Sequence, residues 1–320
     1  MAKRGDLFVV APCTANVIGK LAHGICDDML TTTMLATKAP KLIAPAMNTG
    51  MWENPILQDN LQKLQGYGYH IIQPIVGRLA CGDTGTGKMA SEETIVEHIL
   101  SYMAKDQDMK GKKILITAGP TQEAIDPVRY ITNHSSGKMG YAIAKMARLR
   151  GAEVTLVSGP VSIKPFTGVN MVSVVSAQDM FEAVTARSAE HDMIIMCSAV
   201  ADYTPTNYSD HKVKKQEGEL TIPLTRTKDI LGYLGEHKTP GQLLVGFSME
   251  TENLIENSHA KLTKKNVDLI CANSISEGNT GFAVDTNKVT LITSGDVKEL
   301  PLCSKEETAD RILDYILTIS

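Results

Sequence analysis

The sequence lacks the features that mark membrane, secreted and nucleic-acid-binding proteins. Its longest apolar stretches reach about eight residues, whereas a helix that spans a bilayer needs about 20. The six cysteines form no CxxC pair and have no histidines at metal-ligand spacing, so we expect neither disulfides nor a zinc site. Asp6 interrupts the apolar N-terminal stretch too early for a signal peptide, and a net charge of −4 argues against a polyanion-binding surface. The sequence therefore predicts a cytoplasmic protein with no membrane or nucleic-acid partner.

Strand-like apolar runs alternate with segments of helical periodicity along most of the chain. The runs are DLFVVAP, KLIAPAM, YHIIQPI, KKILITAG, AEVTLVSG, DMIIMCSAV, QLLVGFS, VDLICAN and KVTLITS. The helical segments are residues 54–65, 92–104, 137–151, 177–189, 251–264 and 306–318. Because continuous apolar strands joined by amphipathic helices form parallel sheets covered on both faces, the predicted fold class is α/β.

A polar segment, AKDQDMKGKK at residues 104–113, interrupts this alternation and predicts a linker. We therefore expect two domains, residues 1–110 and residues 111–320. The first domain holds only three of the strand-like runs, whereas a doubly wound domain usually has about five. This shortage predicts a first domain that lacks part of its fold.

Two motifs of the first domain lie where open α/β sheets bind ligands, after the strands. In PAMNTGMW, the amide of Asn48 suits a planar heterocycle or a carboxylate, and Met51 and Trp52 could cover a ring. In GRLACGDTGTGKMA, Cys81 lies among glycines, where a thiol could reach a substrate as nucleophile or proton donor. The alternative is structural: apolar core for Met47, Met51 and Trp52, and a buried thiol for Cys81.

A long polar loop separates the first strand-like run of the second domain from its helix. The loop carries Asp126, Arg129 and Asn133 and ends in SSGKMG, which is similar to a phosphate-binding P-loop. The match fails because Thr132 and Met139 stand where a P-loop needs Gly and Ser or Thr. What remains is a helix N-terminus that can hold an anion through backbone N–H groups, or serines that only cap the helix.

Small and basic residues follow two further strand-like runs of the second domain. In CSAVADYTPTNYSDHKVKK, Ser198 allows close approach of a ligand, Asp202 follows at the ligand edge, and Lys212 lies on a polar loop. After VGFSMET, Lys261 and Lys265 share one helix face at i, i+4 spacing. Such lysines can close over phosphates and stabilise charge in a transition state, or they can form an ordinary solvated face.

Taken in order, these motifs resemble a known enzyme family. GPTQEAIDPVRYITNHSSGKMG, AVADY, KVKK, VGFSMET and LICAN resemble the phosphopantothenate–cysteine ligase domain. PAMNTGMW and ACGDTGTGKM resemble the phosphopantothenoylcysteine decarboxylase domain that bacteria fuse ahead of it. The resemblance covers nearly the whole chain and implies a flavodoxin-like unit followed by a Rossmann-like ligase domain with a doubly wound parallel sheet.

For the second domain, the resemblance implies CTP-dependent ligation of 4′-phosphopantothenate with L-cysteine through an acyl-cytidylate. Asn133 would contact the activated acyl group, and Lys212 would act from a closing loop. The positions that match CTP-binding residues of the family are Met196, Cys197, Ser198, Asp202, Lys212, Lys228, Asp229, Ile230, Leu231, Phe247, Lys261 and Lys265. Mg²⁺ or Mn²⁺ would accompany the triphosphate, and the sequence does not identify its ligands. The family's ligase domain is dimeric, so we expect a homo-oligomer.

For the first domain, the resemblance implies FMN-dependent decarboxylation of the ligation product to 4′-phosphopantetheine. Asn48 would meet the flavin and the substrate carboxylate, and Cys81 would supply a proton. Family members carry an upstream first strand, a flavin-phosphate loop and a catalytic histidine, and none of these precedes Asp6. We therefore expect a truncated flavodoxin-like unit with impaired decarboxylase activity.

Two alternatives from other functional classes stay open. A nicotinamide-dependent oxidoreductase of Rossmann type would share the fold class, although no GxGxxG follows KKILITAG. A flavin-binding or assembly module would bind FMN and catalyse no ligation. The ligase interpretation requires that Asn133, Asp202 and Lys212 lie close enough, after any loop closure, to share one small molecule.

Overall fold

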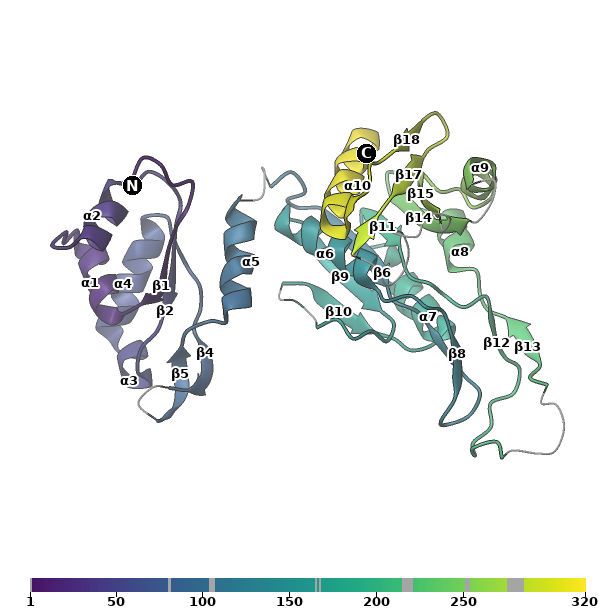
Figure 1. The fold of residues 1–320 in the computed structure, drawn as a ribbon, viewed down its shortest axis with the longest axis horizontal. Helices are drawn as coiled ribbons and strands as arrows, with labels where there is room; N and C mark the ends of the chain where they lie inside the picture. The colour runs from purple at the N-terminus through teal and green to yellow at the C-terminus, as the bar shows by residue number, and fades with distance from the viewer. Residues whose placement is uncertain are drawn as a thin grey trace. The chain divides into compact units, whose positions relative to one another are not determined.

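The computed structural model describes residues 2–79, 82–103, 107–164, 166, 168–214, 221–250, 254–274 and 285–320. The chain forms two compact units, Met1–Asp106 and Gln107–Ser320, each with its own strands and helices (Figure 1). Both units combine sheets with helices, which confirms the predicted α/β class. No helix within these ranges is both long enough and apolar enough to cross a bilayer.

Unit 1 is built on a parallel sheet with the strand order β1-β2-β3. Its strands are β1 (Phe8–Cys13), β2 (Lys41–Pro45) and β3 (Tyr69–Ile71), and β4 (Ile75–Arg78) pairs with β5 (Thr84–Lys88) in a separate antiparallel hairpin. Its helices are α1 (Ala15–His23), α2 (Met29–Ala36), α3 (Thr49–Trp52), α4 (Pro55–Gly66) and α5 (Glu92–Met103). In β2, Ile43 packs with residues of α1 and α4, whereas Leu42 packs with Ile95 of α5. Helices therefore cover both faces of this sheet, because neighbouring strand residues point to opposite faces.

Unit 2 contains a sheet with the strand order β10-β9-β6-β11-β14-β15-β17-β18. Its strands are β6 (Lys113–Ala118), β9 (Glu153–Ser158), β10 (Asn170–Ser173), β11 (Met193–Met196), β14 (Leu243–Glu250), β15 (Leu269–Ser274), β17 (Val289–Ile292) and β18 (Val297–Glu299). The strands from β10 to β15 are parallel, and β17 and β18 are antiparallel. Along the chain, the parallel strands have the Rossmann order, which reverses between β6 and β11. The predicted doubly wound sheet is therefore confirmed.

Helices and short hairpins surround the large sheet. The helices are α6 (Lys138–Leu149), α7 (Ala177–Ser188), α8 (Ile230–Glu236), α9 (Leu254–Lys264) and α10 (Lys305–Ile319). The small two-stranded sheets pair β7 (Gln122–Ala124) with β8 (Tyr130–Thr132), β12 (Tyr203–Pro205) with β13 (Leu224–Arg226), and β16 (Thr286–Asn287) with β19 (Cys303–Ser304). The local sequence sets where helices begin: Ser176 and Asp179, for example, form a capping box at the start of α7.

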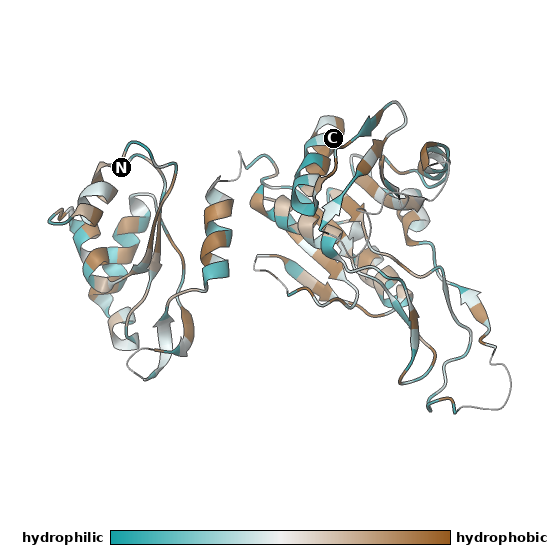
Figure 2. Cartoon of the chain, viewed as in Figure 1, coloured by the Kyte–Doolittle hydropathy of each residue, from teal (hydrophilic) through white to brown (hydrophobic). Residues whose placement is uncertain are grey.

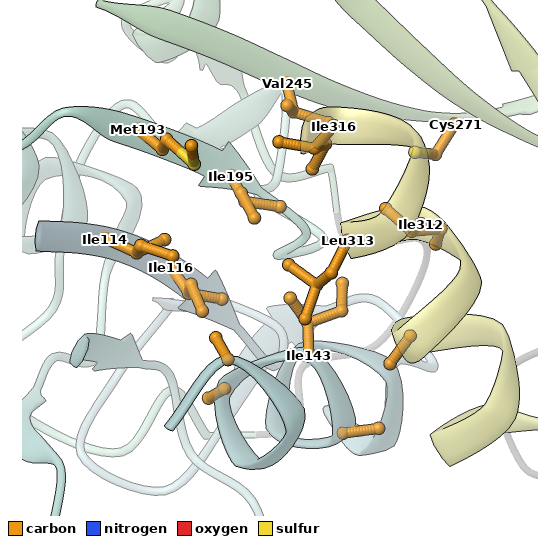
Figure 3. Close-up of a cluster of buried hydrophobic side chains, with 14 of the residues drawn as sticks. Ile114, Ile116, Ile143, Met193, Ile195, Val245, Cys271, Ile312, Leu313 and Ile316 are labelled. Atoms are coloured by element: carbon orange, nitrogen blue, oxygen red, sulfur yellow. The ribbon is translucent and has the colours of Figure 1, made fainter. Parts of the chain in front are cut away.

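Two apolar clusters hold the large sheet, one on each face. In Figure 3, Ile114 and Ile116 of β6 lie beside Ile143 of α6 and Leu313 of α10. Leu115, between the two isoleucines, belongs to the other cluster, with residues of α7 and α8. Figure 2 shows that α10 carries both hydrophobic and hydrophilic residues, as expected of a helix with one face on a sheet.

The segment that enters unit 2 is packed against it. Met109 is fully buried in the same cluster as α6 and α10. Asp108 pairs with Arg150 at 2.6 Å, and Arg150 also pairs with Asp310 and Asp314 of α10. The predicted linker is therefore wrong for residues 107–113, because a buried methionine and a charged network anchor them.

Candidate functional site

Two cavities of unit 2 lie at the carboxyl ends of β6 and β11, where the strand order reverses. The first cavity has a volume of about 460 Å³ and the second a volume of about 420 Å³. Both are lined by Ser198, Val200, Asp202, Phe247 and Lys261. Because they share these walls, the two cavities adjoin and form neighbouring parts of one site.

Buried hydroxyl groups fix the backbone beneath this site. Thr117 Oγ1 accepts hydrogen bonds from the N–H groups of Cys197 and Ser198, both at 3.1 Å, and donates to Ser198 Oγ at 2.8 Å. Thr121 Oγ1 accepts from Ala201 N at 3.0 Å. Both threonines are fully buried, so these bonds form in a low-dielectric interior that strengthens them. Sequence reasoning missed both residues, because they occur within an ordinary strand and turn pattern.

Asn133 connects the long polar loop to the residues after β11. Its Nδ2 donates to the carbonyl oxygens of Ala199 at 3.0 Å and Val200 at 3.3 Å. Asn133 also lines the second cavity. The amide nitrogen therefore positions the wall of the site, and Oδ1 is the atom that remains to accept from a ligand.

The structure brings most of the predicted CTP-binding positions together. All of them except Cys197 and Lys212 line the first cavity: Met196, Ser198, Asp202, Lys228, Asp229, Ile230, Leu231, Phe247, Lys261 and Lys265. Cys197 lines the second cavity. Residues from β11, β14, α8, α9 and the loops between them thus meet at one edge of the sheet.

In the first cavity, a hydrogen bond and an ion pair hold the Asp229 carboxylate in place. Asp229 accepts from Gly232 N at 3.0 Å, and Lys265 Nζ lies 2.9 Å from Asp229 Oδ1. Burial would raise the pKa of Asp229, but the Gly232 N–H and the ammonium groups of Lys265 and Lys261 lower it below its ordinary value. Lys228 Nζ lies 4.4 Å from the centre of the Phe181 ring. The lysines and carboxylates together suit a ligand that carries both negative charge and hydroxyl groups.

The second cavity contains the start of α6. Gly137 occupies the N-cap position with a φ of 77° and has no side chain with which to cap the helix. A Cβ on Gly140 would lie 2.8 Å from Thr117 O, so only glycine allows α6 to approach β6 this closely. Burial raises the pKa of the nearby Cys197 thiol to about 12, which keeps it uncharged. A helix N-terminus with glycine at its N-cap, beside a neutral thiol, favours an anionic ligand.

Lys212 lies outside the lining of both cavities, on an exposed loop. The next residue, Val213, donates its N–H to Asp126 at 3.1 Å and accepts from Arg129 Nη2 at 2.8 Å. Asp126 is only 2% exposed, and its hydrogen bond with Arg129 lowers its pKa well below the ordinary value. The structure therefore places Asn133 and Asp202 at one site and anchors the Lys212 loop apart from its walls. Lys212 can share that site only if its loop moves.

In unit 1, the two sequence motifs pack against each other. Met47 N donates to Gly87 O at 3.0 Å, and a Cβ on Gly87 would lie 2.4 Å from Met47 O. Asn48 caps α3 by accepting from Gly50 N at 2.8 Å, and Met51 is exposed. Met47 and Trp52 are partly buried and pack against the core of the unit, as the structural alternative predicts for them.

The described part of unit 1 fits a flavin only in part. Asn48 and the exposed Met51 are the groups that could meet a planar ring after β2. Cys81 lies outside the described residues. Across the described ranges of both units, no group of three His, Cys, Asp or Glu side chains could hold a metal ion.

Comparisons with known proteins agree with this two-unit organisation. The family described as DNA/pantothenate metabolism flavoprotein C-terminal domain matches residues 109–319, and the Flavoprotein family matches residues 1–104. The second match does not support the predicted truncation of the first unit. With the strand order of unit 2, the two matches confirm the predicted sequence of a flavodoxin-like unit and a Rossmann-like unit.

Three known proteins illustrate the similarity. The coenzyme A biosynthesis bifunctional protein CoaBC of Bacillus subtilis (strain 168) is 49% identical over 319 residues, which are 98% of this chain and 78% of that protein. A cysteine/cysteine sulfinic acid decarboxylase from an unknown prokaryotic organism is 45% identical over 98% of this chain and 89% of its own length. The crystal structure of a CoaBC C-terminal domain is 48% identical, with a TM-score of 0.57, over 66% of this chain and 96% of that one. The chain therefore belongs to the family of bifunctional coenzyme A biosynthesis proteins, CoaBC.

Proposed function

We propose that unit 2 ligates 4′-phosphopantothenate with L-cysteine and uses CTP to activate the acid. The observation that carries this proposal is the site at the β6–β11 switch point, where Asn133 lies with all the predicted CTP positions except Lys212. Membership of the CoaBC family supports the same activity. The nucleoside would occupy the first cavity, where Asp202 could bind the sugar or the base.

The reaction would proceed in two displacements. A carboxylate oxygen of phosphopantothenate attacks the α-phosphorus of CTP, pyrophosphate leaves, and an acyl-cytidylate forms. The amine of cysteine then attacks the acyl carbon, CMP leaves, and the amine loses a proton as the amide forms. Asn133 would lie beside the acyl group: its Nδ2 is already engaged by the backbone, so its Oδ1 could accept from the amide N–H or a hydroxyl of the pantothenoyl part, or from the incoming amine of cysteine.

Charge stabilisation at the phosphates would be the main catalytic contribution. Lys261 lines both cavities and so lies where a triphosphate would pass from one to the other. Lys212 would add its charge when its loop closes. Mg²⁺ or Mn²⁺, when bound with the nucleotide, would neutralise phosphate charge alongside these lysines.

For unit 1, we propose FMN-dependent decarboxylation of the ligation product to 4′-phosphopantetheine. Bound FMN would supply the redox chemistry that makes the carboxylate labile. Asn48 would bind the substrate carboxylate, and Cys81 would supply a proton. The decarboxylase relative favours a second candidate for this unit, in which cysteine or its sulfinic acid is the substrate.

We also propose that unit 2 pairs with a second copy through its hairpins. Val128, Tyr130, Tyr203 and Leu224 are large apolar or aromatic residues that lie exposed on or beside β8, β12 and β13. Figure 1 shows the β12–β13 hairpin extending from the large sheet. Sedimentation velocity of the isolated chain would test this pairing, and a monomer at micromolar concentration would refute it.

The predicted cytoplasmic location stays a prediction.

An assay of all products from the purified chain tests the proposed function. CMP should appear only when CTP, phosphopantothenate, cysteine and Mg²⁺ are all present, and carbon dioxide should follow if FMN is bound. A visible spectrum shows whether the protein carries FMN, and carbon dioxide from cysteine alone would favour the second candidate for unit 1. Tight NADPH binding without CTP binding would instead indicate an oxidoreductase.

A further inference from the structure

Lys305 is a buried lysine that the proposed function leaves without a role. It is the first residue of α10, is only 7% exposed, and lines the second cavity together with Asn133 and Cys197. Its backbone N–H donates to Asp285 O at 2.9 Å, and Ser304 caps the helix through Glu307 N. The lysine is therefore held firmly at the cavity wall. Lysine side chains are almost never this buried unless an opposite charge or a function retains them.

Positive charge converges where Lys305 meets the cavity. Lys138, the first residue of α6, lines the same cavity, so two helices begin there with the positive ends of their dipoles. Lys138 Nζ pairs with Asp285 Oδ1 at 2.6 Å, so one carboxylate faces two ammonium groups. Burial and the charge of Lys138 lower the pKa of Lys305 below its ordinary value, and Asp285 offsets this only in part. Two ammonium groups and two helix N-termini at one cavity favour an anionic ligand there.

The neighbouring thiol adds no negative charge to the cavity. Cys197 lines the same cavity, but burial raises its pKa to about 12 and leaves the thiol protonated at neutral pH. The cavity also adjoins the predicted nucleoside site through Lys261 and Phe247. A phosphate group of a substrate is thus the anion that both the charge and the position favour.

We propose that Lys305 binds a substrate phosphate group in the second cavity and is a further binding residue of the ligase site. This inference rests on the proposed function. Two substrates could supply the phosphate: CTP, through the phosphates that leave as pyrophosphate, or the acid substrate, through its 4′-phosphate. In either case, the ammonium group would bind through charge-assisted hydrogen bonds.

Binding measurements on two variants test this proposal. Lys305→Met keeps a long apolar stem and removes the charge, whereas Lys305→Arg keeps the charge. Isothermal titration of each with CTP, CMP, phosphopantothenate and pantothenate separates the two phosphate sources. Lys305→Met should weaken either CTP or phosphopantothenate by about tenfold or more, while CMP and pantothenate stay within about twofold. Lys305→Arg should recover most of the lost affinity.

Lys145→Met is the matched control. Lys145 lies on the same helix as Lys138 and pairs with Glu306 at 2.6 Å, but it does not line the second cavity. This control should bind all four ligands like the wild type. If Lys305→Met fails to fold, as judged by circular dichroism, Lys305→Gln gives the same comparison with a polar end.

Three outcomes have distinct meanings. No loss with Lys305→Met, or equal losses for ligands with and without the phosphate, would overturn the inference. A loss of turnover with unchanged binding would also overturn it, because the lysine would then act in the chemical step and not in binding the phosphate. Failure of the wild type to bind CTP or phosphopantothenate would instead contradict the proposed function.

Discussion

The floor of the unit 2 site and the loop that carries Lys212 are held in different ways. Uncharged hydroxyl groups of Thr117 and Thr121 fix the floor from within the interior. The loop is held at Val213 by Asp126 and Arg129, a charged pair whose arginine is partly exposed. The comparison shows that the site has two parts. The backbone fixed by Thr117 and Thr121 forms its wall, and the Lys212 loop, tethered at Val213, forms its arm. Substitutions in the wall should alter binding and stability, and substitutions in the arm should alter turnover.

The largest effect is expected from Lys212→Gln. Loss of a cation that acts only after loop closure should lower kcat about 100-fold and change the CTP dissociation constant about threefold or less. Lys214→Gln is the control, because Lys214 is exposed on the same loop. Steady-state kinetics and CTP titration check the split. Equal losses in kcat and affinity would show that Lys212 contributes only to ground-state binding and would remove the distinction between wall and arm.

Thr117→Val should have the next largest effect, and it should act on the wall. It leaves the N–H groups of Cys197 and Ser198 without their acceptor, which should lower the free energy of unfolding by about 1–3 kcal/mol. CTP binding should weaken with it. Thr155→Val is a control at another buried threonine, which contacts His191. Urea denaturation measures the free energy of unfolding of both variants, and CTP titration measures their affinity. Equal CTP affinity in Thr117→Val and the wild type would contradict the role assigned to Thr117.

Asp126→Asn should weaken the tether of the Lys212 loop and leave the backbone around Thr117 and Thr121 unchanged. We expect kcat to fall about tenfold and CTP affinity to stay near the wild-type value, because the tether at Val213 loses its charge. The lowered pKa of Asp126 also gives a pH effect. Its contribution to stability is present above its ordinary pKa of about 4 and is lost as pH falls toward the lowered value. Below about pH 4, the wild type should therefore lose stability more steeply than Asp126→Asn in thermal unfolding.

The smallest effect is expected from Phe181→Leu. This change removes the aromatic face beneath Lys228 Nζ and leaves the lysine in place. A cation–π contact of this kind contributes about 0.5–1 kcal/mol, so CTP affinity should weaken by about two- to fivefold with kcat unchanged. A fluorescence titration would measure it. A larger loss would mean that Phe181 supports the wall in a further way.

The fold was largely predictable because its elements are strongly patterned. The long apolar strands and amphipathic helices such as α6, α7 and α10 followed from periodicity alone. The short strand β10 and helices α1, α2 and α8 were missed, since brief segments carry little periodic signal. The packing of Met109 was missed as well, because its neighbours in sequence are polar and only tertiary contacts bury it.

The site was predictable where polar residues follow strands, as Ser198 and Asp202 do. Parallel strands bring their carboxyl ends to one edge, so such residues meet in space. Thr117 and Lys305 were not predictable in this way. The first looks like an ordinary strand residue, and the second like an ordinary surface lysine at the start of a helix, until the fold places both at the cavities.

Isotope transfer tests the central claim most directly. Phosphopantothenate with its carboxylate oxygens labelled with ¹⁸O is turned over with CTP and cysteine, and the CMP is analysed by mass spectrometry. Attack of the carboxylate on the α-phosphorus predicts that each CMP carries one labelled oxygen and that pyrophosphate carries none. Label in inorganic phosphate or pyrophosphate, or unlabelled CMP formed during ligation, would contradict the acyl-cytidylate route proposed for this site.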